Sequence, residues 1–415
     1  MKKASKTSGW IALAVLLVAT PAAAIAYDAQ NAHRVDGKHA VGAGATKAAR
    51  AGKLVATNSK GFLPNNIIKK AVNSAKLGGK PKGFFAPATH THKGVPYEDV
   101  IIVAKSGGDF TSVQGALDSF TGSLNNPVLI WVAPGEYAGT FALEPYVSVQ
   151  GAGKRLTTLR SDVGGATAVI EMAEGSTVSD VRIVNTDRPD EENVGVTTGG
   201  GSAELHDVSM RVEASGPSDP SAVGVEITGP EVQMLIKNAS IEVSLGGGGA
   251  GTGVQIANAS GDIRSSSINV ISFGVGPAGG PMRGINNASG VVSVTDSDIS
   301  TLYGSTAVGV LTGLTGVSAV SNLRDTNVQA GYGDSLSRAL LLNGDSPQVH
   351  VRGSRLWTLA GAVIQSSVTG ISYIRIANTE LNGGDNQVGV TDSVRCLFSW
   401  DEDFAALDDD CDPVL

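Results

Sequence analysis

The sequence predicts an all-β fold, a right-handed parallel β-helix (a three-sheet solenoid) with about 28 residues per coil. Three observations predict it: a four-residue unit that recurs along most of the chain, apolar runs that recur between its copies, and abundant glycine. The 415 residues include 54 Gly and only 5% aromatic residues, without a strict G-X-Y period. The chain is therefore long enough for a large core, and its composition suits many short strands and turns.

The repeated unit begins with a small polar residue and ends with an aliphatic residue or Met. Its copies are DVRI at Asp180, DVSM at Asp207, NASI at Asn238, SSSI at Ser265, DSDI at Asp296, DTNV at Asp325, GSRL at Gly353 and NTEL at Asn378. Two further apolar runs fall between most copies, for example GVEI at Gly224 and QVHV at Gln348. Three short strands per repeat, without a helical period, predict three parallel sheets around an apolar interior.

The first position of the unit accepts Asp, Asn, Ser and Gly, which are the residues that tight turns favour. Four of these positions carry aspartate: Asp180, Asp207, Asp296 and Asp325. Aligned carboxylates could hold a cation or cleave a glycosidic bond. A catalytic or ligand position would not accept Asn, Ser and Gly as well. We therefore interpret this position as a turn.

Before the repeats, the sequence predicts the first coils and a short N-terminal capping helix. Strands are expected at DVIIVA (99–104), VLIWVAPGEY (128–137) and YVSVQGAG (146–153). Between the first two, Thr111 as N-cap and Gln114 at the third helical position predict a capping box. One apolar stripe, which has to lie on the first coil, is formed by Val113, Ala116, Leu117 and Phe120.

The expected organisation is a signal peptide at 1–26, a basic arm at 27–97, the β-helix at 98–395 and a C-terminal cap at 396–415. Three lysines precede the apolar run WIALAVLLVA, and Ala24 to Ala26 fit a cleavage site. This run is short for a bilayer, and no later segment is long and apolar enough to span one. We expect a secreted protein (extracellular, periplasmic or at the cell surface) without a membrane span after cleavage.

Charge divides the mature chain into a basic and an acidic part. Between Asn31 and Val95 there are about twelve Lys and Arg against one acid, Asp36, whereas the rest carries about sixteen basic and thirty-seven acidic residues. The basic part has few large apolar residues and is expected to be flexible. It is either a solvated spacer, which we prefer, or an arm that touches an anionic polymer. We expect no nucleic-acid partner.

The two cysteines, Cys396 and Cys411, are both near the end of the chain. In an oxidising compartment they are expected to form a disulfide whose loop of about 15 residues contributes roughly 3 kcal/mol. They lack a CxxC spacing, and no metal or other cofactor is expected. Trp400 and Phe404 are expected to cover the open edge of the last coil.

The segments GDFTSVQGALDSF, VLIWVAPGEYAG and YVSVQGAGKRLTTLRSD resemble the N-terminal part of the pectinesterase family, within the pectin-lyase-like β-helix superfamily. The resemblance covers about 99–162 and continues weakly through 179–196. It implies the β-helix fold and, for a true esterase, catalytic Gln, Asp and Arg residues in the motifs QAVAL, QDTL, DFIFG and GRPW. These motifs are absent, and Asn193 occupies the first Gln position. The resemblance therefore assigns no catalytic residue.

Two functions remain open. The first, which we prefer, is a non-catalytic secreted or surface protein that binds a glycan, a cell-envelope component or a protein partner. The second is a polysaccharide-active enzyme, an esterase or a lyase, with a non-standard site. Candidate groove residues for either function are Asp296, Asp298, Arg324, Asp325 and Trp357, with Tyr303 and Tyr332 as further candidates. His206 and His350 lie about five coils apart and are not expected to act together.

Overall fold

The computed structural model describes residues 34–35, 38–42, 44–57, 59–61, 76–77, 80–81, 97, 99–161, 168–186, 192–215, 221–273, 280–314, 318–331, 336–359, 361–368, 372–383, 385–388, 393–397 and 399–400. The predictions for the signal peptide, Tyr332, Phe404 and Cys411 fall outside these residues. The chain divides into two units, Met1–His92 and Lys93–Leu415.

The first unit contains only short elements in its described residues. They are β1 (Arg34–Val35), β2 (Lys38–Val41), α2 (Lys47–Arg50), β3 (Leu54–Val55), β4 (Lys76–Leu77) and β5 (Lys80–Pro81). The first three strands form one small sheet, and β4 pairs with β5. No residue described between Lys38 and Gly61 is buried. The strands β2 and β3 thus form without a buried core, in keeping with the scarcity of large apolar residues.

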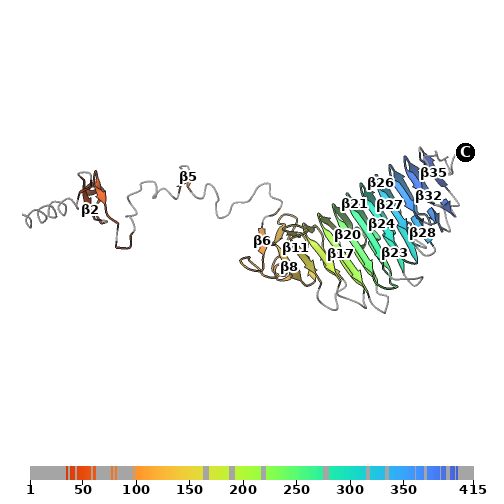
Figure 1. Ribbon diagram of the computed structural model, residues 1–415, viewed down its shortest axis with the longest axis horizontal. Coiled ribbons are helices and arrows are strands. Elements are labelled where there is room, and N and C mark those ends of the chain that lie inside the picture. Colours follow the sequence, from red (N-terminus) through yellow and green to blue (C-terminus); the bar gives the residue numbers. More distant parts are fainter. Residues whose placement is uncertain are drawn as a thin grey trace, which may run out of the picture. The chain divides into compact units, whose positions relative to one another are not determined.

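The second unit is a parallel β-solenoid whose strands stack coil upon coil along three faces (Figure 1). Face 1 consists of β9 (Phe141–Ala142), β12 (Ala168–Met172), β15 (Asn193–Thr198), β18 (Ala222–Thr228), the first parts of β21 (Gly251–Arg264) and β23 (Pro281–Thr295), β25 (Thr306–Thr312), β28 (Leu336–Leu342), β31 (Ala362–Ser366) and β34 (Asp385–Val388).

Face 2 begins with β6 (Asp99–Val103), β7 (Val128–Val132), β10 (Val147–Gly151), β13 (Thr177–Ser179), β16 (Ser202–His206) and β19 (Gln233–Lys237). It continues through the second parts of β21 and β23 to β26 (Val320–Arg324), β29 (Gln348–Arg352), β32 (Tyr373–Ala377) and β35 (Ser393–Leu397). Because β21 and β23 run through the corner, hydrogen bonds join faces 1 and 2 into one 20-stranded sheet. The three predicted sheets are thus three faces but two sheets.

Face 3 is a separate 10-stranded sheet. It consists of β8 (Gly135–Ala138), β11 (Thr157–Arg160), β14 (Arg182–Asn185), β17 (Ser209–Ala214), β20 (Ser240–Leu245), β22 (Ser267–Ser272), β24 (Asp298–Leu302), β27 (Asn327–Gly331), β30 (Arg355–Thr358) and β33 (Glu380–Asn382). Pairings such as Ile241 with Ile268 confirm the predicted repeat of about 28 residues per coil.

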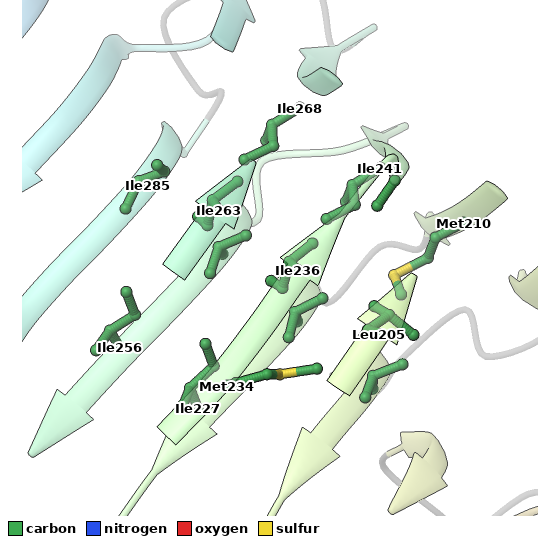
Figure 2. Close-up of a cluster of buried hydrophobic side chains, with 14 of the residues drawn as sticks. Leu205, Met210, Ile227, Met234, Ile236, Ile241, Ile256, Ile263, Ile268 and Ile285 are labelled. Atoms are coloured by element: carbon green, nitrogen blue, oxygen red, sulfur yellow. The ribbon is translucent and has the colours of Figure 1, made fainter. Parts of the chain in front are cut away.

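The last residues of the repeated units form the inner surface of face 3. Met210, Ile241 and Ile268 are direct neighbours in the register, and each is no more than 2% exposed. Figure 2 shows them pointing toward side chains of the other two faces, such as Ile236 and Ile227. The aliphatic position that recurs in the sequence is therefore the repeating contact of the core.

The first residue of every unit adopts a left-handed conformation, with φ between 49° and 62° in all eight copies. This conformation turns the chain from face 2 to face 3, and Gly, Asn and Asp adopt it at the lowest cost. The turn interpretation of Asp180, Asp207, Asp296 and Asp325 is therefore confirmed. Ser265, at φ 49°, is the least suited of the eight residues.

Ser265 offers a test of this turn. We expect Ser265→Val to lower the free energy of unfolding by about 1–2 kcal/mol, because a β-branched side chain tolerates φ near 50° poorly. Ser265→Gly is expected to be nearly neutral, since relief of backbone strain offsets the larger chain entropy of glycine. Urea unfolding of both variants measures the difference. Equal stability of the two variants would contradict the turn interpretation.

The second residue of the unit changes along the solenoid from apolar to hydroxyl-bearing. From Ser266 onward, buried hydroxyls form a ladder; for example, Ser297 Oγ accepts from the Ser266 backbone N–H at 3.1 Å. It also donates to the carbonyl of Thr295, two residues before, at 2.8 Å. These hydroxyls satisfy backbone groups that the turn removes from the strand ladder.

The first coils contain the predicted strands and helix, with two differences. The helix α4 (Val113–Leu117) begins one residue later than predicted: Ser112 is the N-cap, and its Oγ accepts from Gly115 N–H at 3.2 Å. Thr111 and Gln114 therefore form no capping box. The run at 128–137 is two strands, β7 and β8, on different faces. The break is at Ala133 and Pro134, and Pro134 lacks a backbone N–H for a sheet ladder.

The apolar stripe of α4 packs as predicted. Val113, Ala116 and Leu117 are buried, and the Phe120 ring lies edge-on to Phe110 with centroids 5.9 Å apart. At the other end, the predicted boundary at residue 396 falls inside β35, where buried Cys396 pairs with Ile376. Trp400 makes a single parallel bridge to Glu380 of face 3. The capping roles and the Cys396–Cys411 disulfide stay predictions.

Candidate functional site

The outer side of face 2 gathers basic side chains in its last coils. In the register of β26, β29, β32 and β35, one row runs through Asn322, His350, Arg375 and Arg395. Arg324 pairs with Arg352 in the adjoining row. Side chains alternate along a strand, so the residues between them point into the core. Leu323, Val351 and Ile376 accordingly are at most 2% exposed.

These side chains line a groove of about 480 Å³, which we call the arginine groove. Its charged and titratable lining residues are Arg324, His350, Arg352, Arg375 and Arg395. No acid contributes to the lining described for it, although the whole chain has a formal net charge of −8. The groove is therefore a local region of positive potential on an acidic protein.

Not all of these cations are equally available to a ligand. Arg324 Nε lies 3.1 Å from Asp325 Oδ2, and His350 Nδ1 lies 3.0 Å from Asn322 Oδ1. Arg352 and Arg375 are exposed and form no ion pair with any residue that the structure describes. Two forked guanidinium groups are therefore free to bind carboxylate or sulfate groups in two-point contacts.

Only part of the candidate set from the sequence meets at this place. Arg324 and Asp325 line a corner pocket of about 350 Å³, together with Arg352, Gly353 and Asn378. Asp296 is the turn residue one coil earlier, and its backbone N–H donates to the Arg324 carbonyl. Asp298 and Trp357 are on face 3, around the corner. The structure therefore does not assemble these five residues into one site.

Sequence reasoning missed Arg352, Arg375 and Arg395, and it considered His350 only as a partner for His206. The two histidines are separated by five strand pairings, as expected. A signal for the groove was available in the repeats. When the repeats are aligned on their turn residues, NLR at 322–324, HVR at 350–352, YIRIA at 373–377 and SVRCL at 393–397 place basic residues at outer positions of successive coils.

Asn193, at the position of the first catalytic Gln in the pectinesterase resemblance, has a structural role. It is fully buried, and its Nδ2 donates to the Glu213 carbonyl. An amide enclosed in this way cannot reach a substrate on the surface.

On face 1, one carboxyl group has an altered proton affinity. Partial burial, and to a smaller extent the charge of Glu192, raise the pKa of Glu226. Gln255 Nε2 lies 3.5 Å from its Oε1, a long contact from the neighbouring coil. Glu226 is not among the lining residues of the grooves described on face 2. Glu226 is instead an acid on another face whose ionised form is disfavoured by its surroundings.

The substitution Glu226→Gln tests whether the ionised form of Glu226 is disfavoured in the folded protein. Because the pKa of Glu226 is higher in the folded protein than in the unfolded chain, the ionised carboxylate opposes folding. The stability that the protonated form preserves at low pH is therefore lost as the pH rises through the folded pKa. We expect the variant to have a higher Tm than the wild type at pH 7, and the difference to vanish near pH 3, below the ordinary Glu pKa of 4.5. Exposed Glu242→Gln is the control. A difference in Tm that does not change with pH would contradict the assignment.

The described residues hold no group of three or more His, Cys, Asp or Glu side chains arranged to bind a metal ion. No helix among them has the length and apolar character needed to cross a membrane.

No sequence model of a protein family matches the chain, and no curated protein matches it. Several solved structures are similar to it. Pectin methylesterase PemA from Erwinia chrysanthemi has a TM-score of 0.38 at 12% identity, over 57% of this chain and 80% of its own. The mannuronan C-5 epimerase AlgE6 A-module from Azotobacter vinelandii has a TM-score of 0.37 at 12% identity, over 70% and 88%.

The pectin methylesterase from carrot has a TM-score of 0.32 at 12% identity, over 73% of this chain and 78% of its own. At these identities the likeness concerns the fold, and the activities of these proteins are not transferred. The strand pairings by themselves establish the parallel β-solenoid.

Proposed function

We propose that this protein is a secreted or surface β-solenoid that binds an acidic polysaccharide in the arginine groove without cleaving it. The carrying observation is the pair of exposed arginines, Arg352 and Arg375, which have no ion pair among the described residues and line one groove. Carboxylate and sulfate groups on a glycan match the forked donors of arginine.

The arrangement suits a polymer better than a small anion. Successive coils of a parallel sheet are about 4.8 Å apart, so the basic rows present charge repeatedly along the solenoid. Tyr373, on the same strand as Arg375 and two residues before it, is 42% exposed. An exposed ring beside cations allows a sugar to stack while its carboxylate is bound. We further propose that the coils are right-handed and that residues 1–26 direct export of the chain.

The test is a binding and turnover panel with purified mature protein. Polygalacturonate and alginate are the acidic polymers, and dextran is the neutral control. We expect retention on the acidic polymers, little on dextran, and a marked loss of binding between 50 and 300 mM salt, since exposed charges at about 0.1 M salt are screened beyond roughly 10 Å. Binding that is equal for dextran and polygalacturonate would contradict the proposal.

The same panel distinguishes a polysaccharide-active enzyme from a protein that only binds the polymer. Glu226 supports it, because a carboxyl group with a raised pKa is a common feature of acid–base catalysts. Release of methanol, unsaturated ends or reducing ends from any polymer would favour an enzyme. If that turnover were lost in Glu226→Gln, while retention on the polymer persisted, face 1 would be its catalytic surface.

A further inference from the structure

A second basic feature lies on face 1, away from the arginine groove. In the register of β23, β25 and β28, Arg283 pairs with Val308, and Val308 pairs with Arg338. The two arginines thus occupy one row, two strand spacings or about 10 Å apart. Earlier in the same row are Val194, Val223 and Thr252.

Most side chains of this row are nearly inaccessible to solvent, although they are not part of the apolar interior of the coils. Val194, Val223 and Val308 are 2%, 5% and 2% exposed, yet none is part of the core cluster. Arg338 is likewise only 5% exposed, whereas Arg283 is half-buried. A ligand could therefore approach Arg283 from solvent and reach toward the enclosed Arg338.

The burial of Arg338 is not fully compensated by the residues that the structure describes. Arg338 Nε is enclosed and has no hydrogen-bond partner among these described residues. Neither arginine forms an ion pair with a described residue, and burial alone lowers the pKa of both guanidinium groups. A buried charge without a partner is costly, and proteins usually retain one where an ion or ligand compensates it.

We infer that Arg338, together with Arg283, forms a binding site for a small oxyanion or carboxylate. The site does not rest on the proposed function, because it is on another face and shares no residue with the arginine groove. Its ligand chemistry is a group with at least two anionic oxygens, which the forked donors of arginine bind best. A free phosphate or sulfate, or the carboxylate of a uronic acid, would meet this requirement.

The test is calorimetric titration with inorganic phosphate, sulfate and digalacturonate as separate ligands at constant ionic strength. All are measured in an Arg352→Ala/Arg375→Ala background, which removes the arginine groove. We expect about one site per chain for at least one ligand, and a loss of affinity of at least tenfold in Arg338→Met and in Arg283→Met. Exposed Arg182→Met, on face 3, is the matched control. If phosphate or sulfate binds more tightly than digalacturonate, the natural ligand is a free inorganic anion. If digalacturonate binds more tightly, the ligand is the carboxylate of a uronic acid.

Thermal unfolding without ligand gives an independent readout. Because no described residue forms an ion pair with Arg338, Arg338→Met is expected to leave the Tm equal or higher, since it removes a buried charge and keeps a similar stem. The bound anion should raise the Tm of the parent protein but not that of the variant. A Tm lowered by several degrees in ligand-free Arg338→Met would overturn the inference. So would the absence of saturable binding, or binding that both arginine variants leave unchanged.

Discussion

Gly253→Val is expected to unfold several coils of the solenoid at room temperature, and Gly253→Ala to lower the free energy of unfolding by about 2–3 kcal/mol. A Cβ atom at Gly253 would lie 2.2 Å from Ile268 Cγ2 and 2.5 Å from the Gly284 carbonyl oxygen. Both contacts are far inside van der Waals distance, and the second is with backbone. The strand can relieve them only by moving away from its neighbours.

Gly253 is one of a row of five glycines in face 1. Each would place a Cβ within 2.5 Å of a side chain that ends a repeated unit on face 3, and within 2.7 Å of the next strand's carbonyl: Gly195, Gly224, Gly253, Gly284 and Gly309. A bulkier residue at any of them would push two faces of the coil apart. Because each coil contacts only its neighbours, the damage should spread from the site rather than abolish all structure.

Urea unfolding followed by circular dichroism measures the effect. Gly200→Ala is the matched control, because a Cβ at Gly200 would meet nothing within 4 Å and its φ is not positive. We expect this control to be neutral or to gain up to about 1 kcal/mol through reduced entropy of the unfolded chain. Equal losses in Gly253→Ala and Gly200→Ala would contradict the close approach of faces 1 and 3.

Charge reversal in the arginine groove, Arg352→Glu with Arg375→Glu, is expected to reduce affinity for polygalacturonate by at least a hundredfold. Each arginine loses a two-point contact and is replaced by a like charge that repels the polymer. Both side chains are exposed and have no ion pair among the described residues, so the fold should keep its stability. Affinity is measured by co-sedimentation or affinity electrophoresis, at low salt and at physiological salt.

Two controls distinguish the effect of charge in the arginine groove from the effect of the net charge of the protein. Arg182→Glu, at an exposed position on face 3, changes the net charge without touching the groove. Arg352→Lys with Arg375→Lys keeps the charge but loses the planar fork, and an intermediate loss of affinity is expected. If Arg182→Glu weakened binding as much as reversal of a single groove arginine, binding would be a property of overall charge and the groove proposal would fail.

The repeat could be read from the sequence because it depends on local requirements. Asp180, Ser265 and Gly353 share a turn position because only certain residues adopt φ near 50° cheaply. Ile241 and Ile268 share an apolar position because each coil has to bury the same side of its strand. Neither requirement needs knowledge of a distant segment. The start of α4 was less well determined, because Thr111 and Ser112 are both good N-caps and packing on the first coil decides between them.

The site was harder to predict because the groove is made by residues 20 to 28 positions apart, brought together by the register of the strands. Arg352 and Arg375 are neighbours only because Arg375 pairs with His350 in the next coil. The same register separates Asp298 and Trp357 from Arg324, since a turn lies between them and redirects the strand to another face. Short distances along the sequence were therefore misleading in the candidate set.

The sequence by itself determined that this chain coils into a parallel β-solenoid, where each coil turns, and which side chains fill it. These properties follow from backbone conformation and from the repeating need to bury one side of each strand. Only the tertiary structure decided which outer residues meet, that Arg352 and Arg375 form no ion pair with a described residue, and that Arg338 Nε is enclosed without a hydrogen-bond partner among the described residues. The physical reason is that outer positions carry no packing requirement, so their pattern has meaning only once the coils are stacked in register.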